Sequence, residues 1–592
     1  MDRKTLFSFI AVYSFALAAT LFLGGNDEID ATSVVDQPSS YILKGESTEQ
    51  VAEAVLAAGG EVTHELAIIQ SVAANLTESQ VDELRIARGI LRIYGNDAVQ
   101  ASGKPVKDSN GGGDETDSGD EVAGSAYTEF PSLVEADVLH DQGIDGWGIT
   151  IAVLDSGIYN GPGITQDRYG MDRLKAVYDA TIDYEYKEGG KSKSAIDFTD
   201  GFDIDENGHG SHVAGVAASG KLSDAGKYNG IAPAAPLVAV KVFDANGVGS
   251  YADVIRGVDW VVANQQNLQI RVLNLSLSAP PRSHYWDDPL NQAVMAAWEA
   301  GIVVVAAAGN TGPDAQSIGV PGNVPYVITV GAMTDNYTPA DGSDDYLATF
   351  SAVGPTYEGF VKPEVVAPGG HMRASMEDVD QIAVDHPSFY LGANFFEMSG
   401  TSQATAVVSG IAALALQMEP GLTPDQVKCK IMSAARPAVK ADGSLAYSVF
   451  QQGAGMVNAY DAVHNWNRDC ANNGLDIAAD LAGTKHFGGR ANQDENGDYY
   501  LMGLDGYLWT NNGADTSGYL WTNGYLWTNG YLWTNAYLWT DGSVDANGYL
   551  WTNGYLWTNG YLWTNGYLWT NGYLWTNSLS ETAGINTWVD QE

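Results

Sequence analysis

The sequence predicts an α/β protein whose central part, residues 126–466, holds a parallel β-sheet covered by helices. Three runs are almost continuously apolar, interrupted only by Thr150 and Lys241, as strands buried on both faces are: residues 149–154, 237–242 and 302–306. Helix-like patterns lie between these runs, at residues 251–263 and 290–300. Strands that alternate with helices form a parallel sheet with helices on both sides. We expect a small α+β unit before this domain and a β-rich repeat tail after it.

Composition limits the function. At 592 residues the chain is too long for one domain, and we expect roughly three or four units. The 29 Lys and Arg stand against 73 Asp and Glu, a formal net charge of −44. This charge argues against nucleic-acid binding, which needs a basic surface. It suits an exported protein, either one adapted to salt or one with an ordinary acidic surface.

The N-terminus has the pattern of an export signal. Arg3 and Lys4 precede an apolar run at residues 6–23, and residues 16–18 offer a small-residue cleavage site. We therefore assign residues 1–24 to a signal peptide and expect a secreted, extracellular protein. The run is close to membrane-spanning length, so an uncleaved signal that anchors the chain in a membrane stays open.

Residues 41–99 have the pattern of a small domain of their own. Strand and helix signals follow in the order β-α-β-β-α-β, which is ferredoxin-like. A helix with Val51 and Val55 ends at Gly59-Gly60, and a second helix is capped at Thr77. Residues 100–125 are acidic and glycine-rich with few apolar residues, so we expect a flexible linker that proteases cut readily.

The chain after residue 466 divides into three parts. We expect a linker at residues 467–505, repeats at residues 506–578 and a short tail at residues 579–592. Tyr-Leu-Trp-Thr occurs ten times in the repeats, first at Tyr507, with a period of six. Two degenerate hexads, residues 513–518 and 543–548, keep the frame.

Three structures fit the repeats. Asn-Gly is a strong hairpin signal, and Tyr-Leu-Trp-Thr suits a short strand, which together favour a meander of hairpins. A β-solenoid would instead stack Tyr on Tyr and Trp on Trp. A disordered tail is the third structure, and we favour ordered β. Exposed Trp would suit contact with a cell surface or carbohydrate, whereas packing of the rings in a core needs no partner.

Two cysteines, Cys429 and Cys470, leave the redox state open. A reducing compartment would keep both as thiols, and export would permit one disulfide. No Cys/His cluster has the spacing of a zinc site, and we expect no metal in the active site.

Three motifs carry the chemistry. Asp155 lies in Ala-Val-Leu-Asp-Ser-Gly, His209 in Asn-Gly-His-Gly-Ser-His, and Ser402 in Ser-Gly-Thr-Ser-Gln-Ala. A serine hydroxyl becomes a nucleophile when a histidine takes its proton and a carboxylate orients that histidine. Glycines at 208 and 210 let a helix begin close to the sheet, and the helix that follows Ser402 points its positive end at the site.

The three motifs, in the order Asp, His, Ser, resemble those of the subtilisin-like serine proteases, or subtilases. The resemblance covers residues 41–466 and implies a subtilisin-like fold and a secreted endopeptidase with a Ser-His-Asp triad. It implies that residues 41–99 are an inhibitor-type propeptide, a partner of the protease until the zymogen processes itself. It also implies that Asn310, in Ala-Ala-Gly-Asn, stabilises the oxyanion. No cofactor is required.

By the same resemblance, protein or peptide substrates pair with two segments of the chain. One contains Ser276, Leu277 and Ser278, and the opposing one contains Gly247, Val248 and Gly249. An extended peptide would add as a strand between them. Ser278 stands where subtilases usually have glycine, and we expect it to narrow the primary pocket.

Two questions stay open from the sequence. Many subtilases bind structural calcium, and Asp494, Glu495, Asn496 and Asp498 could bind it, although a solvated turn is the favoured interpretation. The alternative function is a surface-binding or adhesive repeat protein whose protease domain is secondary. The complete triad and Asn310 favour the enzyme.

Overall fold

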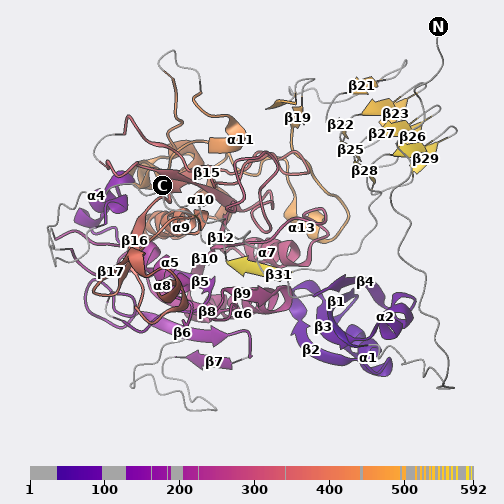
Figure 1. The fold of residues 1–592 in the computed structure, drawn as a ribbon, viewed down its shortest axis with the longest axis horizontal. Coiled ribbons are helices and arrows are strands. Elements are labelled where there is room, and N and C mark those ends of the chain that lie inside the picture. The colour runs from indigo at the N-terminus through magenta and orange to yellow at the C-terminus, as the bar shows by residue number, and fades with distance from the viewer. Residues whose placement is uncertain are drawn as a thin grey trace, which may run out of the picture. The chain divides into compact units, whose positions relative to one another are not determined.

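Figure 1 shows the computed structural model of the chain. It describes residues 37–96, 128–161, 163–182, 184–187, 205–223, 226–339, 342–440, 445–493 and 497–501, short strands between 514 and 570, strand 582–585 and residue 589. The expected signal peptide, and the expected linker at residues 100–125, lie outside the described residues. In the described part, no helix combines the length and the apolar character that crossing a membrane requires.

The N-terminal unit has the expected ferredoxin-like topology. Its elements are β1 (Ser39–Gly45), α1 (Thr48–Ala57), β2 (Glu61–Leu66), β3 (Ser71–Leu76), α2 (Glu78–Arg85) and β4 (Ile90–Gly95). The strands pair antiparallel in the order β2-β3-β1-β4. Thr77 and Gln80 form a capping box at the start of α2, because each side chain bonds the other's backbone N–H. Val51, Val55, Val81 and Leu84 are buried in a core that this unit makes for itself.

The central sheet is mainly parallel, as the sequence predicts. Across it, within the described residues, lie β14 (Tyr346–Leu347), β13 (Ile328–Thr334), β12 (Val303–Ala307), β10 (Ile270–Leu275), β5 (Thr150–Asp155), β8 (Leu237–Lys241), β6 (Leu174–Asp179) and β7 (Tyr184–Lys187), and β15 (Val365–Pro368) also pairs with β13. Only β14 and β7 run antiparallel to their neighbours. The apolar runs form β5, β8 and β12, and every residue of these strands is buried.

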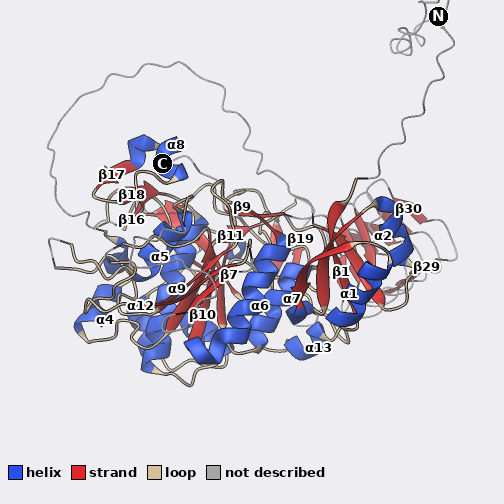
Figure 2. Ribbon diagram, turned by 90° about the horizontal axis from the view of Figure 1, so that it is seen from below, coloured by secondary structure: helices blue, strands red, loops and turns tan. Residues whose placement is uncertain are grey.

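Helices cover both faces of this sheet. α5 (His209–Ala218) packs against α9 (Thr401–Met418), and α6 (Tyr251–Leu268) packs against α7 (Pro289–Glu299). Figure 2 shows the strands of the sheet between α9 and α6. Residues 404–416, which lie within α9, are all buried, so this helix is apolar on every side. The first residues of α5 and α9 lie at the ends of parallel strands, α5 at the end of β5 and α9 beside the segment that follows β10.

Smaller elements surround the sheet and its helices. They are α3 (Phe130–Leu133), α4 (Ala136–Asp141), β16 (Met372–Ser375), α8 (Gln381–Asp385), β17 (Tyr390–Gly392), β18 (Phe395–Met398), α10 (Pro424–Ala434), α11 (Val449–Gln452), α12 (Ala459–His464), α13 (Ile477–Leu481), β19 (Ala491–Gln493) and β20 (Tyr499–Leu501). Of these, β16, β18 and β17 form a small antiparallel sheet.

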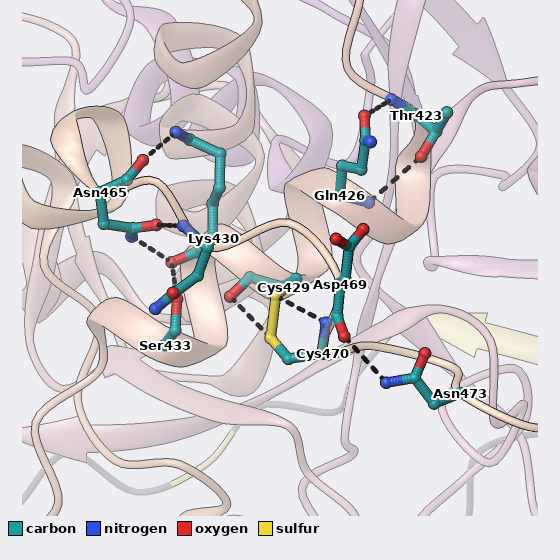
Figure 3. Close-up of a disulfide and its surroundings, with 10 residues drawn as sticks. Thr423, Gln426, Cys429, Lys430, Ser433, Asn465, Asp469, Cys470 and Asn473 are labelled. Carbon is teal, nitrogen blue, oxygen red and sulfur yellow. Dashed lines mark hydrogen bonds between the residues drawn. A yellow bond between two sulfur atoms is a disulfide. The ribbon is translucent and has the colours of Figure 1, made fainter.

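Cys429 and Cys470 form a disulfide, so the cysteines are not free thiols (Figure 3). The bridge joins α10 to the chain that follows α12, 41 residues later. A disulfide that closes a loop of this length is expected to stabilise the fold by about 3–4 kcal/mol. Beside it, Lys430 Nζ donates to the carbonyl oxygen of Asn465 at 2.5 Å.

The segment at residues 467–505 differs from the linker that we expected. It holds α13, β19 and β20, and α13 places the buried carboxylate of Asp480 against the domain. That carboxylate accepts hydrogen bonds from Tyr285 Oη at 2.6 Å and from Tyr326 Oη at 3.1 Å. Two buried hydroxyls would lose their acceptor without it, so the segment contributes to the packing of the catalytic domain.

The strands of the repeat region pair in parallel, with each residue opposite the residue 18 positions later. The strands are β21 (Ala514–Thr516), β22 (Leu520–Thr522), β23 (Leu526–Thr528), β24 (Leu532–Thr534), β25 (Tyr537–Thr540), β26 (Val544–Ala546), β27 (Leu550–Thr552), β28 (Tyr555–Thr558), β29 (Leu562–Thr564) and β30 (Leu568–Thr570). Leu520 is opposite Leu538, and Trp521 is opposite Trp539. The offset means three hexads per coil, which is the solenoid and not the meander of hairpins.

The two degenerate hexads also supply strands, β21 and β26. Ala514 of β21 is opposite Leu532, and Val544 of β26 is opposite both Leu526 and Leu562. Because every third hexad pairs, the described strands form three sheets, and loss of one hexad would move each later strand into a different sheet. This gives a structural reason why the degenerate hexads keep a length of six residues.

Asp205 anchors the chain where α5 begins. It is fully buried, and its Oδ2 accepts hydrogen bonds from Ser211 N at 2.8 Å and Ser211 Oγ at 2.6 Å. Its Oδ1 accepts from Gly208 N at 2.9 Å and from Ser156 Oγ at 2.7 Å. Because Ser156 follows β5 directly, this carboxylate ties the end of the strand to the first turn of the helix.

Asp205→Ala should lower the free energy of unfolding of the catalytic domain by at least about 3 kcal/mol, since several buried donors lose their acceptor. Thermal unfolding of Ser402→Ala protein, which cannot digest itself if Ser402 is the nucleophile, would measure the change. Asp378→Ala is the control, because this carboxylate is exposed and its removal should have a small effect. Equal unfolding temperatures for the two variants would show that Asp205 is not an anchor.

Candidate active site

Asp155 and His209 meet at the carboxyl end of the central sheet. Asp155 is the last residue of β5, and His209 is the first of α5. His209 Nδ1 lies 2.7 Å from Asp155 Oδ1, and both side chains are fully buried. Asp155 Oδ1 also accepts from Ser156 N at 2.8 Å, which fixes the carboxylate. The arrangement places the proton of the imidazole on Nδ1.

The glycine at position 210 allows this approach. A Cβ on Gly210 would lie 2.1 Å from the carbonyl oxygen of Gly157 and 3.2 Å from Asp155 Cβ. Gly208 has φ +95°, a left-handed conformation that side chains disfavour. The helix can therefore begin against the sheet only because the residues beside His209 lack side chains.

The other ring nitrogen of His209, Nε2, is left without a partner in the part of the chain that the structure describes. His209 Nε2 is buried, and no group among the described residues lies within hydrogen-bonding distance of it. A buried polar atom without a partner costs free energy and calls for an explanation, of which a catalytic role is one. If His209 Nδ1 donates to Asp155, Nε2 carries the lone pair of the neutral ring.

Ser402 is the second residue of α9 and is buried. Its Oγ donates to the carbonyl oxygen of Ser276 at 3.1 Å, and Ser276 Oγ donates to the carbonyl oxygen of Ser402 at 2.9 Å. Asn274 Nδ2 in turn donates to Ser276 Oγ at 2.9 Å. These bonds fix the start of α9 to the segment that follows β10, and the helix N-terminus favours negative charge there.

Asn310 is held close to Ser402 by hydrogen bonds to Thr401, the residue before the serine. Asn310 Oδ1 accepts from Thr401 N at 3.0 Å and from Thr401 Oγ1 at 2.8 Å. With its oxygen engaged, the amide presents Nδ2 as its donor. A Cβ on Gly400 would lie 3.3 Å from that Nδ2, so the donor faces the turn that leads to Ser402.

A second histidine, His212, lies one turn further along α5. Burial, reinforced by the charge of His209, lowers the pKa of His212 to about 3. Its Nε2 lies 3.1 Å from the carbonyl oxygens of Met372 and Phe396, to which a neutral ring donates. His212 therefore stays neutral near pH 7 and adds no positive charge beside His209.

The two expected substrate segments form short strands. They are β9 (Val248–Ser250) and β11 (Leu277–Ser278). Gly247 lies in the turn before β9, with φ +72° and its N–H bonded to the carbonyl oxygen of Asp244. Ser276 precedes β11 and contacts Ser402, as described above. Within the described residues, β9 and β11 do not pair with each other, but β31 (Thr582–Ile585) pairs with both.

Ser278 fills space that neighbouring glycines leave open. A Cβ on Gly319 would lie 1.9 Å from Ser278 Oγ, and a Cβ on Gly309 would lie 3.0 Å from it. Ser278 Oγ thus lies between two glycines, one of them directly before Asn310. The expectation that Ser278 narrows the primary pocket stays a prediction.

Sequence reasoning missed three side chains that position the site: Asp205, Thr401 and Asn274. Asp205 lies in a polar stretch from 203 to 207 with nothing to single it out, and Thr401 was part of a motif without an assigned role. For metals, no three His, Cys, Asp or Glu side chains gather into a metal-binding group in the described part of the chain. The acidic loop considered for calcium lies outside that part at residues 494–496.

Comparisons with known proteins show the family of this chain. Residues 146–456 match the subtilase family (Peptidase_S8). Serine protease AprX of Bacillus subtilis (strain 168) is 40% identical over 331 residues, 55% of this chain and 68% of AprX. Subtilisin DY of Bacillus licheniformis is 32% identical over 305 residues, 51% of this chain and 89% of that protein.

A solved structure shows the same fold. It is fervidolysin from Fervidobacterium pennivorans, described as a keratinolytic enzyme related to subtilisin, with a TM-score of 0.53 and 22% identity. The similarity covers 74% of this chain and 62% of fervidolysin. The fold, the family match and the relatives agree, and the chain belongs to the subtilase family of serine proteases.

Proposed function

We propose that this chain is a secreted serine endopeptidase made as a self-processing zymogen. Ser402 is the nucleophile, His209 the general base and then the general acid, and Asp155 the carboxylate that orients His209. Asn310 is the oxyanion donor. The observation that carries this proposal is the buried 2.7 Å bond between Asp155 and His209, which leaves His209 Nε2 as an unpartnered base.

The chemistry is acyl transfer. Ser402 Oγ attacks the scissile carbonyl carbon while its proton moves to His209 Nε2, and Asp155 stabilises the imidazolium that results. The negative charge that develops on the carbonyl oxygen accepts a hydrogen bond from Asn310 Nδ2. His209 then gives its proton to the leaving amine, and the acyl-enzyme is hydrolysed when His209 takes a proton from water. No step requires a cofactor.

Substrates are proposed to be proteins in extended or flexible segments. β9 and β11 offer main-chain hydrogen bonds to an added strand, and such bonds do not depend strongly on side-chain identity. Folded proteins rarely offer an extended segment that can leave its own sheet, so unfolded proteins and short peptides are the favoured class.

Ser402→Ala should abolish hydrolysis of casein and of short peptides, since no other group in the site can form the acyl-enzyme. Asn310→Ala should lower kcat by about 10²–10³ with little change in KM, because its hydrogen bond strengthens only in the transition state. Thr311→Ala is the matched control at an exposed neighbouring position. Hydrolysis by Ser402→Ala at the wild-type rate would refute the assignment of the nucleophile.

The contacts of the N-terminal unit support its proposed role as a propeptide. Its residues bond the first half of α6, where Asp259 Oδ2 accepts from Ile68 N at 3.2 Å and Asp253 Oδ1 lies 3.0 Å from His64 Nε2. Arg92 also pairs with Asp287, just before α7, at 3.1 Å. These polar contacts join two units that each have a core, as an inhibitor and its enzyme do.

Maturation should cut the chain between Gly95 and Tyr127. This stretch joins the N-terminal unit to the protease and has the composition that proteases cut readily. N-terminal sequencing of the secreted active enzyme would locate the cut, and Ser402→Ala protein should retain residues 41–94. An active form with these residues still covalently attached would count against a zymogen.

The repeat region is proposed to bind a surface, either a cell surface or a carbohydrate, in addition to the protease function. A solenoid of hexads that are mostly alike repeats the same residues at a regular spacing, which suits a repetitive partner. A mainly adhesive protein is not favoured, because the family match and the relatives are proteases.

Deletion of residues 507–577 should leave kcat for short peptides unchanged, since the triad and Asn310 all lie before residue 466. The same deletion should reduce retention on insoluble protein or polysaccharide, which a co-sedimentation assay would measure. A truncated chain that fails to fold or process itself would instead make the repeats part of the protease's structure.

A further inference from the structure

A segment near the C-terminus lies between the two substrate strands. β31 (Thr582–Ile585) pairs antiparallel with β9 on one side and with β11 on the other, and Figure 1 shows β31 beside β9. Ala583 is opposite Gly249, and Gly584 is opposite both Val248 and Ser278. The segment is therefore the middle strand of a small sheet whose two outer strands come from the catalytic domain.

The segment runs in the direction that leads to the nucleophile. Its first residue, Thr582, is opposite Ser250, and its last, Ile585, is opposite Leu277. Ser276 precedes Leu277, and its carbonyl oxygen accepts the hydrogen bond from Ser402 Oγ at 3.1 Å. The strand thus proceeds from the far end of the groove toward Ser402 with its C-terminal end leading.

The sequence of the segment suits this position. Thr-Ala-Gly-Ile has no charge, no proline and no side chain larger than isoleucine. Proline would remove a backbone donor from a middle strand. In the described residues, β9 and β11 have no other strand partner, so the segment covers edges that would otherwise be unpaired.

We propose that residues 582–585 are an intramolecular inhibitor strand that binds in the substrate-binding groove and competes with peptide substrates. This inference rests on the proposed function of β9 and β11 as the substrate strands. A peptide that adds between β9 and β11 needs the same backbone hydrogen bonds that β31 makes. Because both cannot be present together, substrate must displace the segment.

The tether makes the competition effective. A segment on the same chain acts at an effective concentration on the order of millimolar, whatever the concentration of the enzyme. A competitor raises the apparent KM by the factor one plus the ratio of its effective concentration to its own dissociation constant, so a strand that binds with a dissociation constant below this concentration raises KM measurably. The expected signature is a higher KM with an unchanged kcat, since the segment leaves the catalytic groups intact once displaced.

The test compares Gly584→Pro with Gly584→Ala in the processed full-length enzyme. Proline removes the backbone N–H and restricts φ, whereas alanine keeps the donor. Gly584→Pro should lower KM for a short chromogenic peptide by about 2- to 10-fold at unchanged kcat. Gly584→Ala should stay near wild type, and a chain that ends at Glu581 should match the proline variant. Wild-type KM in both the proline variant and the truncated chain would overturn the proposal.

A second measurement does not depend on activity. In Ser402→Ala protein, the amides of β9 and β11 should be protected from hydrogen exchange, and Gly584→Pro in the same background should expose them. Unchanged protection would overturn the inhibitor strand even in an active enzyme. Loss of hydrolysis in every variant would instead contradict the proposed protease function, while exchange would still report whether the segment occupies the groove.

Discussion

The structure of the catalytic domain depends on keeping one carboxylate and one imidazole together away from water. Asp155 and His209 are fully buried and 2.7 Å apart. Burial of a charged group is costly unless its hydrogen bonds are satisfied. Asp155 Oδ1 accepts from Ser156 N and faces His209, whereas Asp155 Oδ2 has no hydrogen-bond partner within the described residues. The buried Asp205 fixes the first turn of α5, and Gly210 lets that helix approach the strand. The parallel sheet is the frame that brings these elements to one edge.

Features of the structure that depend on residues close together in the chain could be predicted from the sequence. Strands β5, β8 and β12 are apolar on both faces because helices cover both, so their sequences show almost continuous apolar runs. Thr77 caps a helix that begins at the next residue, and the glycines around His209 are its direct neighbours, so a short stretch of sequence is enough to recognise both. Asp155, His209, Ser402 and Asn310 could be proposed as site residues because each lies in a short motif. The structure joins Asp155 to His209 and Asn310 to Thr401, and nothing in the spacing of the motifs indicates these two contacts.

Interactions between distant segments could not be predicted in the same way. Asp205 is one of several acids in a polar stretch, and only the folded chain shows that it accepts bonds from both Ser156 and Ser211. Asp480 lies in a segment that reads as a linker, yet it accepts bonds from Tyr285 and Tyr326. Thr-Ala-Gly-Ile carries no sign of its partners 300 or more residues earlier. In the repeats, Asn-Gly suggested hairpins, but the offset of 18 residues stacks like residues in parallel, a pairing that a single hexad cannot reveal.

The claim on which the account rests is that Ser402 is a nucleophile activated by the buried pair. The most direct measurement is to treat the processed enzyme with a serine-directed fluorophosphonate, digest it and locate the adduct by mass spectrometry. The account predicts one adduct, on Ser402, that forms more slowly in Asp155→Asn, because the imidazole loses the carboxylate that orients it. An adduct on a different serine, or an unlabelled Ser402 in enzyme that the reagent inactivates, would contradict it.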